Sequence, residues 1–582
     1  MVASSKAAPA AGTAAASSSS SSFNVTPQPV SEPISLDGPT PEGEKQREPL
    51  LSALDRDFPA ESAEGLARRE RILEKLTTLV QEWTHEVGVL KRMMDEESAR
   101  EAGAKIFLFG SAKLGVLTPN SDCDCVCVVP KHITRDDFFG NLVPKLQEHR
   151  DFIQEINPVP EANTPIIEMK IEGVAVDLGF AQLNVPTLKG IESLQNNDLL
   201  RGLDEKSVRG IGGNRVNQLV LDLVPNKDAF REALRFVKAW SKARGIASNM
   251  LGFFGGITWA ILIARVCQLY PNFNGPMVIQ RFFRVFSQWH WGWNRPVLLT
   301  NIVHAPANSP LVSLRVWDPH NNPHDKYHLM PILTPSFPAM NSTHNVSETT
   351  KRVLIAELKR GRQYVDEVFA GRKKWTDVYA KHVFFAMHKD YIRVQLVAKN
   401  AAAFSRWEGF IESKLRLFVR NLEQVCPGFE FRPWPEKYDL GDDSKNILSN
   451  WPVSKQMFIG VSKQKQTSHE DAPSETAATD FRLAVERFVE NLSSMMKQEG
   501  YSEGQQDLLI TDGKREELPL ELRVLATPEV MVNEQPVEGA AAAIGKREAE
   551  VEASTIATVI DHATTGPETK KRKKIGVMLA SS

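Results

Sequence analysis

The sequence predicts an α+β protein built from several domains, and three observations support this prediction. At 582 residues the chain exceeds what one hydrophobic core usually holds, so its length indicates about three or four domains plus tails. Strand-like apolar runs surround Asp124 and Asp177, whereas residues 191–350 read as largely helical with loops. A strand–helix–strand order returns beyond residue 390. We therefore expect two sheet-containing domains separated by a helical domain.

Both ends of the chain have a composition typical of disorder. Residues 1–58 are rich in Ala, Ser and Pro, and they include an uninterrupted serine run at 17–22. Such segments bury too little apolar surface to fold. From residue 526 to 582 the chain is again of low complexity and ends near five basic residues at 570–574. We therefore predict a disordered N-terminal tail over 1–58 and a disordered C-terminal tail over 526–582.

Changes of pattern divide the remaining sequence into three predicted domains. Residues 59–190 combine N-terminal helices with strands around the aspartates. Residues 191–350 form a central helical domain, and residues 351–525 form a smaller α+β domain. No internal repeat is visible.

Periodicity places the main elements within these domains. Apolar residues at helical spacing predict helices, and strict alternation predicts strands. The apolar stretch 251–264 is followed by Arg265 and is shorter than the ~20 residues that span a bilayer, so we expect a buried helix. The other expected elements are helices near 72–83, 137–149, 228–244 and 404–422 and strands over 391–398 and 456–461.

Two aspartates separated by one residue, Asp122 and Asp124, are the most informative feature of the chain. Residues i and i+2 of a strand point to the same face, so both carboxylates project together. Such groups repel unless a cation lies between them, and Mg²⁺ prefers oxygen ligands while keeping places for substrate phosphates. The preceding turn, Phe109-Gly110-Ser111, offers backbone N–H groups and a hydroxyl to a triphosphate.

Asp177 lies in a second strand-like run and is the third candidate carboxylate. A lone Asp-x-Asp is usually a solvated strand edge or a loop. The Gly-Ser turn before the pair and Asp177 after it favour the catalytic interpretation. Three carboxylates, two metal ions and a phosphate-binding turn indicate nucleotidyl transfer.

The cysteines and the net charge exclude several other classes. Cys123, Cys125 and Cys127 alternate with the aspartates, so they face the other side of the strand and pack as small apolar residues. Five cysteines are too few for a disulfide framework and leave no second pair for a zinc site, which indicates a reducing compartment. No signal peptide is visible. The net charge of −2 restricts any nucleic-acid surface to a local basic patch.

The segment from Phe109 through Asp124, followed by Asp177, resembles the nucleotidyltransferases of the polymerase-beta-like superfamily. Further segments between roughly residue 60 and 465 resemble the eukaryotic nuclear poly(A) polymerases. The resemblance implies a polymerase-beta-like catalytic domain, a helical central domain and an RNA-binding C-terminal domain with an RRM-like fold. The segments that resemble the poly(A) polymerases are Leu223-Val224-Pro225-Asn226, Leu251-Gly252-Phe253-Phe254-Gly255-Gly256-Ile257-Thr258-Trp259-Ala260, Cys267-Gln268-Leu269-Tyr270-Pro271, Trp317-Asp318-Pro319, Tyr327-His328-Leu329-Met330-Pro331-Ile332 and Asn341-Ser342-Thr343-His344-Asn345-Val346-Ser347.

The resemblance also implies which residues hold the nucleotide. On the expected helix at 228–244, Arg235, Lys238 and Lys242 share one face, which by itself is usually a solvated basic face. Lys238 matches the family lysine that contacts the phosphates, and Lys242 matches a second basic position. The full set implied for nucleotide binding is Phe109, Gly110, Ser111, Thr118, Lys238, Ala247, Gly256 and Ile257.

Two departures from the family pattern concern the choice of base. Ala247 stands where the family usually has a tyrosine, and Gly212-Gly213 stands where it usually has Asn-Gly. Asn214 lies close enough in sequence to take the role of the missing asparagine. The selection of adenine is therefore less firmly implied than the chemistry.

The implied reaction is template-independent addition of AMP from ATP to the 3′ end of RNA, with release of pyrophosphate, during mRNA 3′-end processing. Asp122, Asp124 and Asp177 are the expected catalytic residues and the ligands of two Mg²⁺ or Mn²⁺ ions. The implied partners are ATP, the 3′ end of pre-mRNA and cleavage and polyadenylation factors, with no membrane. RNA phosphates are expected to contact basic residues of the third domain, namely Lys414, Arg416, Arg420, Lys455, Lys463 and Lys465.

Two rival functions remain open from the sequence. One is a terminal uridylyltransferase or another noncoding-RNA nucleotidyltransferase of the same superfamily, and the other is a catalytically silent RNA-binding scaffold. The third domain argues against the first, and the complete set of carboxylates with Lys238 argues against the second. We expect a nuclear protein, because the basic run 570–574 has the composition of an import signal, although it also suits a nonspecific RNA-binding tail.

Overall fold

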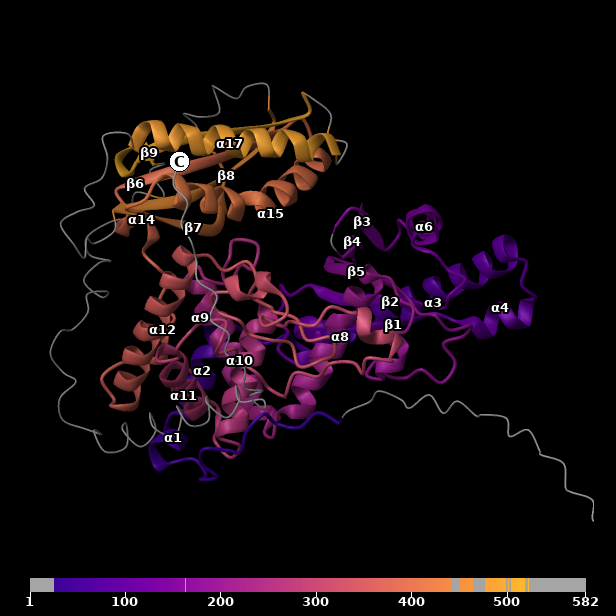
Figure 1. The fold of residues 1–582 in the computed structure, drawn as a ribbon, viewed down its shortest axis with the longest axis horizontal. Helices are drawn as coiled ribbons and strands as arrows, with labels where there is room; N and C mark the ends of the chain where they lie inside the picture. The colour runs from indigo at the N-terminus through magenta and orange to yellow at the C-terminus, as the bar shows by residue number, and fades with distance from the viewer. Residues whose placement is uncertain are drawn as a thin grey trace, which may run out of the picture.

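The computed structural model describes residues 26–162, 164–440, 451–463, 477–498, 501, 504–518 and 522. Figure 1 shows three regions: a small sheet with α3 and α4, a central group of helices, and a second sheet with two long helices. The predicted order of sheet, helices and sheet is therefore confirmed. No helix in the described ranges has the length and apolar character needed to cross a membrane.

The first sheet carries the aspartates and has the strand order β1-β2-β5-β4-β3. β2 and β5 run parallel to each other, and the remaining neighbours are antiparallel. Cys123, Cys125 and Cys127 are buried with α3 on one face of the sheet, as predicted. The strands are β1 (Lys105–Leu108), β2 (Cys123–Val129), β3 (Ile153–Val159), β4 (Ile166–Ile171) and β5 (Val174–Gln182).

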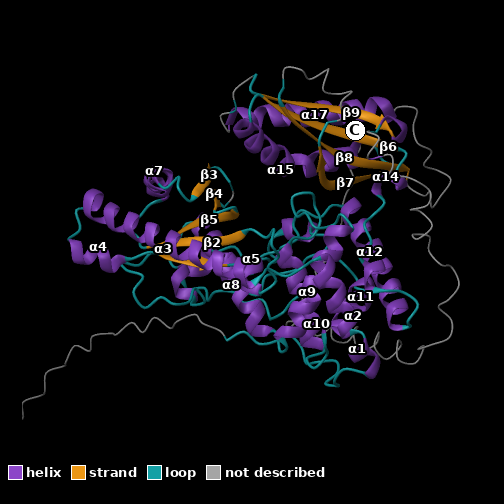
Figure 2. Ribbon diagram, turned by 180° about the vertical axis from the view of Figure 1, so that it is seen from behind, coloured by secondary structure: helices purple, strands orange, loops and turns teal. Residues whose placement is uncertain are grey.

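Helices cover both faces of this sheet (Figure 2). The apolar stripe that predicts a helix near 72–83 belongs to α3, which buries Leu76 and Trp83 against the strands. α8 lies on the other side and contacts β2 and β5. The helices of this region are α3 (Ala63–Arg92), α4 (Glu96–Ala102), α5 (Gly110–Leu114), α6 (Arg135–Asp137), the π-helix η1 (Phe138–Leu142), α7 (Val143–Glu148), the 3-10 helix η2 (Asn197–Leu200) and α8 (Glu205–Leu223).

The predicted start of the central domain at residue 191 is corrected by this packing. Leu194, Leu200 and Ile211 join Val126 and Val128 of β2 in one apolar cluster, so the chain from 191 to 223 completes the second face of the catalytic sheet. The pattern there reads as helical because α8 is helical. The spacing of apolar residues predicts that this segment is a helix, but it does not predict the sheet against which the helix packs.

The central region is built around α10, which is almost entirely buried, so the apolar stretch at 251–264 does form a buried helix, beginning later than predicted. α9 and α11 pack against it, and α12 packs on α11. The elements are α9 (Lys227–Ala243), α10 (Gly256–Leu269), α11 (Gly275–Ser287), the 3-10 helices η3 (Pro310–Ser313) and η4 (Pro323–Tyr327), α12 (Glu348–Phe369) and α13 (Trp375–Val378).

Residues 26–58, which we name the N-terminal strap, contradict the prediction of a disordered tail over 1–58. The strap runs along the central helices, where the amide of Val30 donates to the carbonyl of Leu299. It contains α1 (Pro41–Lys45) and α2 (Arg47–Asp57), and α2 buries Leu50 and Leu54 completely. The average composition of 1–58 conceals these few apolar side chains. The remainder of the tail, residues 1–25, lies outside the described residues, as does the predicted tail from 526 onward.

The second sheet has the strand order β7-β8-β6-β9, and α15 packs on it and against α17. The strands at 391–398 and 456–461 and the helix at 404–422 are confirmed with longer bounds. The elements are α14 (Phe384–Met387), β6 (Asp390–Ala398), α15 (Ala401–Val425), β7 (Phe429–Tyr438), β8 (Val453–Lys463), α17 (Ala477–Gln498), β9 (Gln506–Lys514) and the 3-10 helix η5 (Arg515–Glu517).

The predicted boundary of this domain at 351 falls inside α12, which packs on the central helices. The junction between the two regions is a buried ionic cluster. Arg244 at the end of α9 donates to both carboxylate oxygens of Glu357 on α12, at 2.9 and 3.2 Å. Arg432 of β7 approaches the same carboxylate at 3.8 Å and bonds His382 at 2.7 Å. This junction cluster ties the second sheet to the central helices.

Candidate active site

The strand register brings two of the predicted catalytic carboxylates side by side. Asp124 of β2 is the direct partner of Asp177 in the neighbouring parallel strand β5. Side chains of adjacent register positions point to the same face of a sheet. Asp122 stands just before β2, two residues from Asp124, and its charge acts on both of the other carboxylates. The three aspartates therefore lie within electrostatic reach of one another, whereas no group of three acidic, His or Cys side chains in the described ranges has the geometry of a formed metal site.

Burial and mutual repulsion disfavour negative charge in this group. Burial, followed by the charge of Asp122, raises the pKa of Asp124 to about 6, and Lys238 opposes this rise. Burial, followed by Glu168, Asp122 and Asp124, raises the pKa of Asp177 to about 7. A divalent cation would relieve both effects. The donor set consists of hard carboxylate oxygens, so the residues present fit Mg²⁺ or Mn²⁺.

The Gly-Ser turn lies directly against these carboxylates. Gly110 has φ of +63°, in the left-handed region, and a Cβ atom there would lie 1.9 Å from Oδ2 of Asp124. The amide of Phe109 donates to the carbonyl of Asp124 at 3.0 Å. Only glycine meets both the conformation and the close approach. Position 110 therefore fixes the turn over the metal-binding face.

Lys238 reaches the same turn from α9. Its Nζ donates to Oγ of Ser111 at 2.6 Å. Burial lowers the pKa of Lys238, whereas Asp124 and Asp122 raise it. A cation thus contacts the hydroxyl of the turn and lies within electrostatic reach of the aspartates, a setting suited to a phosphate group of a nucleotide.

α8 supports the turn from behind, with contacts that the sequence analysis did not identify. Asn217 accepts a hydrogen bond from the amide of Gly110 at 2.5 Å. Asn214 donates to the carbonyl of Leu108 at 2.7 Å, so its amide also holds the backbone of the strand before the turn. A Cβ atom at Gly213 would lie 2.8 Å from the ring of Phe109, whereas Gly212 faces open space. Nothing in the sequence pattern distinguishes these roles.

The remaining predicted nucleotide contacts lie on different elements. Thr118 bonds Ser121, with 2.9 Å between the two hydroxyl oxygens. Ala247 is exposed in the loop after α9, and Gly256 is the exposed first residue of α10. Ile257 is partly buried against the central core. α10 contacts α5, so the start of the central domain and the Gly-Ser turn belong to neighbouring elements.

The basic residues of the predicted helix at 228–244 and of the third domain have different surroundings in the structure. Arg235, which shares a helix face with Lys238, pairs with Asp55 of the strap at 2.8 Å and also donates to the carbonyl of Phe58, so it holds the strap against α9. Lys242 remains exposed. In the third domain, Lys455 lies 3.5 Å from a carboxylate oxygen of Glu408. These pairings could not be read from the spacing of the basic residues.

The other predicted RNA contacts have varied settings. Lys414 lies over the ring of Phe410, and Arg416 is half-buried and donates to the carbonyl of Ser413. Arg420 is exposed on α15, and Lys463 is exposed at the end of β8. Lys465 lies outside the described residues. The structure therefore leaves Arg420 and Lys463 as the most accessible members of the predicted set.

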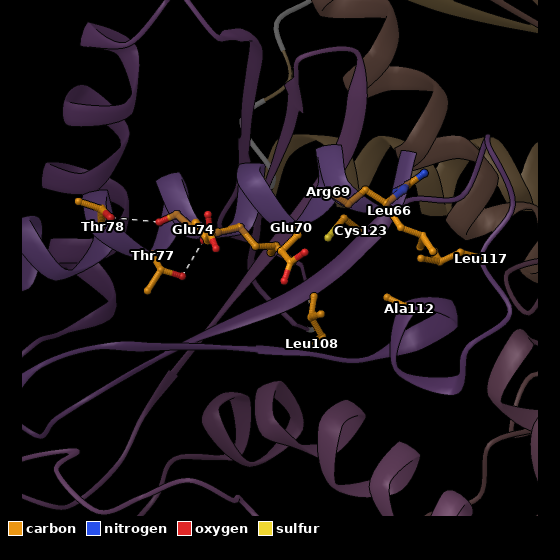
Figure 3. Close-up of a pocket in the computed structure, with 11 residues that line it drawn as sticks. Leu66, Arg69, Glu70, Glu74, Thr77, Thr78, Leu108, Ala112, Leu117 and Cys123 are labelled. Carbon is orange, nitrogen blue, oxygen red and sulfur yellow. Dashed lines mark hydrogen bonds between the residues drawn. The ribbon is translucent and has the colours of Figure 1, made fainter. Parts of the chain in front are cut away.

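A pocket of about 660 Å³ lies on the opposite face of the catalytic sheet, between α3 and α5 (Figure 3). Cys123 lines it, whereas Asp122 and Asp124 do not. Because Cys123 and Asp124 point to opposite faces of β2, this pocket is separate from the carboxylate site. Its other lining residues are Leu66, Arg69, Glu70, Leu73, Glu74, Thr77, Thr78, Leu108, Ala112 and Leu117.

Three family models match consecutive parts of the chain. Residues 30–224 match the poly(A) polymerase nucleotidyltransferase domain. Residues 229–381 match the poly(A) polymerase central domain, and residues 383–447 match the poly(A) polymerase predicted RNA binding domain. The first match begins in the strap and ends at α8, in agreement with the packing described above.

Curated relatives match over most of their length. Poly(A) polymerase PAPalpha of Candida albicans is 41% identical over 402 residues, which cover 69% of this chain and 70% of that protein. Poly(A) polymerase pla1 of Schizosaccharomyces pombe is 36% identical, with 77% of each chain covered. Nuclear poly(A) polymerase 1 of Arabidopsis thaliana is 37% identical, covering 79% of this chain and 62% of that protein.

Solved structures of the Cid1 poly(U) polymerase are more distant. One of them aligns with 13% identity and a TM-score of 0.39, covering 58% of this chain and 99% of that one. A second aligns with 13% identity and a TM-score of 0.41. At this level of similarity neither structure bears on the substrate of the present chain.

Proposed function

This chain belongs to the poly(A) polymerase family, and from that premise we propose how its residues carry out the reaction. The enzyme adds AMP from ATP to the 3′ end of RNA without a template and releases pyrophosphate. The observation that carries the proposal is the register pair Asp124–Asp177, with Asp122 beside it and the Gly-Ser turn against it.

Asp122, Asp124 and Asp177 are the residues that would hold two divalent ions, Mg²⁺ or Mn²⁺. When bound, such ions supply charge neutralisation at the attacking hydroxyl, the α-phosphate and the departing pyrophosphate. Asp177 orients the primer 3′-hydroxyl and accepts its proton. The bond from this oxygen to the α-phosphorus forms as the bond to the bridging oxygen of pyrophosphate breaks.

The triphosphate is held by the turn and by two neighbouring helices. Ser111 and Lys238 already contact each other and present a hydroxyl and a cation. α10 begins after Gly255, which provides no side-chain cap, so the first amides of the helix at Gly256 and Ile257 are available to phosphate oxygens. Thr118 and Ala247 complete the proposed pocket, and the small side chain at Ala247 leaves adenine selection to other groups.

One assay tests the activity against both rival functions. Purified full-length protein is given an oligo(A) primer, Mg²⁺ or Mn²⁺, and each nucleoside triphosphate in turn. We expect extension with ATP and little with UTP, GTP or CTP. Preferred addition of UTP would favour a uridylyltransferase, and no addition with any nucleotide would favour a silent scaffold.

The cellular setting follows from the same family. We propose that the enzyme acts in the nucleus on pre-mRNA ends released by cleavage, together with cleavage and polyadenylation factors. The naming of the Arabidopsis relative as nuclear supports this location. The basic run at 570–574 lies outside the described residues. Its replacement by alanine in a fluorescent fusion should move the protein to the cytoplasm without reducing primer extension in vitro.

A further inference from the structure

A fourth carboxylate lies next to the proposed metal ligands. Glu168 of β4 is the direct antiparallel partner of Asp177 on β5. On the other side, Asn157 of β3 is the direct partner of Glu168. One row of the sheet therefore carries Asp124, Asp177, Glu168 and Asn157 on four adjacent strands, with their side chains on one face.

The charge of Glu168 has no cation to neutralise it among the residues that the structure describes. Its Oε2 accepts a hydrogen bond from Nδ2 of Asn157 at 2.7 Å, which orients the carboxylate without changing its charge. Lys170, two residues further along β4 and on the same face, lies instead 3.4 Å from a carboxylate oxygen of Glu155. A nearby lysine is thus committed to another partner.

An unneutralised carboxylate beside a metal ligand has a definite physical consequence. Directly opposed residues of antiparallel strands have Cβ atoms roughly 4.5–5.5 Å apart, close enough for like charges to repel. This repulsion destabilises the empty site, and a divalent cation at Asp177 would turn it into attraction. Glu168 is exposed, so solvent screening keeps the effect moderate.

We propose that Glu168 is a positioning residue of the metal site, which strengthens divalent-ion binding at Asp177 through its charge. This inference rests on the proposed metal site formed by the three aspartates. Asn157, on the strand on the far side of Glu168 from Asp177, fixes the orientation of the Glu168 carboxylate through its hydrogen bond.

The test measures metal binding directly. Mn²⁺ binding to full-length protein is followed by the electron paramagnetic resonance signal of free Mn²⁺, with a non-hydrolysable ATP analogue present. We expect the dissociation constant to rise about threefold to tenfold in Glu168→Gln. The dissociation constant of Glu168→Asp, which restores the charge, should lie between those of Glu168→Gln and the wild type. In primer extension, the Mg²⁺ concentration at half-maximal rate should rise by the same factor, whereas kcat at saturating Mg²⁺ stays unchanged.

Two further variants make the result decisive. Glu172→Gln removes the same charge from the same hairpin, about 16 Å of strand away from Asp177, and should bind Mn²⁺ as the wild type does. Asp124→Ala should lose most Mn²⁺ binding. Unchanged binding in Glu168→Gln together with lost binding in Asp124→Ala would overturn the role of Glu168 alone. Unchanged binding in Asp124→Ala would overturn the metal site itself, and this inference with it.

Discussion

The carboxylate of Asp177 connects the metal site to the attacking hydroxyl, so its removal tests the mechanism at a single residue. Asp177→Ala should lower the rate of primer extension by about a hundredfold or more, because a metal ligand and a proton acceptor are lost. Asp122→Ala and Asp124→Ala should have similar effects. Circular dichroism should show an unchanged fold. An Asp177→Ala enzyme that extends a primer at nearly the wild-type rate would contradict the three-carboxylate assignment.

The raised pKa values of Asp124 and Asp177 predict how the metal-free enzyme responds to pH. Their folded-state values of about 6 and about 7 exceed the ordinary value of 3.8. Between roughly pH 4 and 7 the folded state therefore binds more protons than the unfolded state, and the contribution to stability falls as pH rises. Without divalent ions, Asp177→Asn should match the wild-type melting temperature near pH 4 and exceed it near pH 8.

Mn²⁺ provides the control for this pH prediction. Added at pH 8, it should raise the melting temperature of the wild type more than that of Asp177→Asn, because the cation takes the place of the lost protons. If the difference between the two proteins without metal does not change with pH, Asp177 is not repelled in the folded state.

Lys238 is placed to test nucleotide binding separately from RNA binding. Its contact with Ser111 puts its charge at the phosphate turn. Lys238→Ala should raise the KM for ATP, because a charge contact with phosphate is lost, and leave primer affinity unchanged. Steady-state kinetics, with the ATP concentration and then the primer concentration varied, separates an effect on ATP binding from an effect on primer binding. The reverse pattern would place Lys238 on the RNA path.

At the scale of elements, α8 offers a pair of adjacent glycines with different surroundings. A methyl group at Gly213 would lie 2.8 Å from the ring of Phe109, whereas one at Gly212 would meet open space. Gly213→Ala should lower the melting temperature and primer extension by displacing the turn. Gly212→Ala should raise helix stability by up to about 1 kcal/mol, the usual gain of alanine over glycine. Thermal unfolding measures the melting temperatures of Gly213→Ala and Gly212→Ala against that of the wild type.

The aspartates could be found from sequence because strand alternation determines which side chains share a face. Glu168 was missed because no separate strand was predicted over 166–171, although the turn at Glu172-Gly173, with both residues at positive φ, sets the register that pairs Glu168 with Asp177. Leu50 and Leu54 of the strap were missed because the Ala-, Ser- and Pro-rich residues around them dominate the composition of 1–58. The contact of the strap with the central helices joins segments distant along the chain, whereas the pairing of Glu168 with Asp177 is local to one hairpin.

At the scale of the whole molecule, the junction cluster is a buried ionic contact between the central helices and the second sheet. The side chains of Arg244 and Glu357 are 1% and 7% exposed. Glu357→Gln would remove the buried carboxylate that Arg244 and Arg432 both approach, and it should lower the free energy of unfolding by about 3–5 kcal/mol. Lys189→Gln, which breaks an exposed ion pair with Glu101, should change the free energy of unfolding by less than about 1 kcal/mol. Denaturant unfolding of both variants supplies the values.

The strap predicts how truncations behave. Removal of residues 1–58 should destabilise the enzyme, because Leu50 and Leu54 leave the central core and Arg235 loses Asp55. Removal of residues 1–25 alone should leave primer extension nearly intact, as their composition indicates. Equal melting temperatures of the two truncated proteins would show that the strap contributes nothing to folding.

The strap also has a mechanical consequence. The polypeptide passes from the central helices to the catalytic sheet between α2 and α3, and it returns between α8 and α9. Leu50 and Leu54 of the strap lie in the same apolar cluster as Leu114 of α5 and Val220 of α8. The two crossings of the chain and this shared cluster connect the catalytic region to the central helices, and together they restrain the Gly-Ser turn against displacement from Lys238.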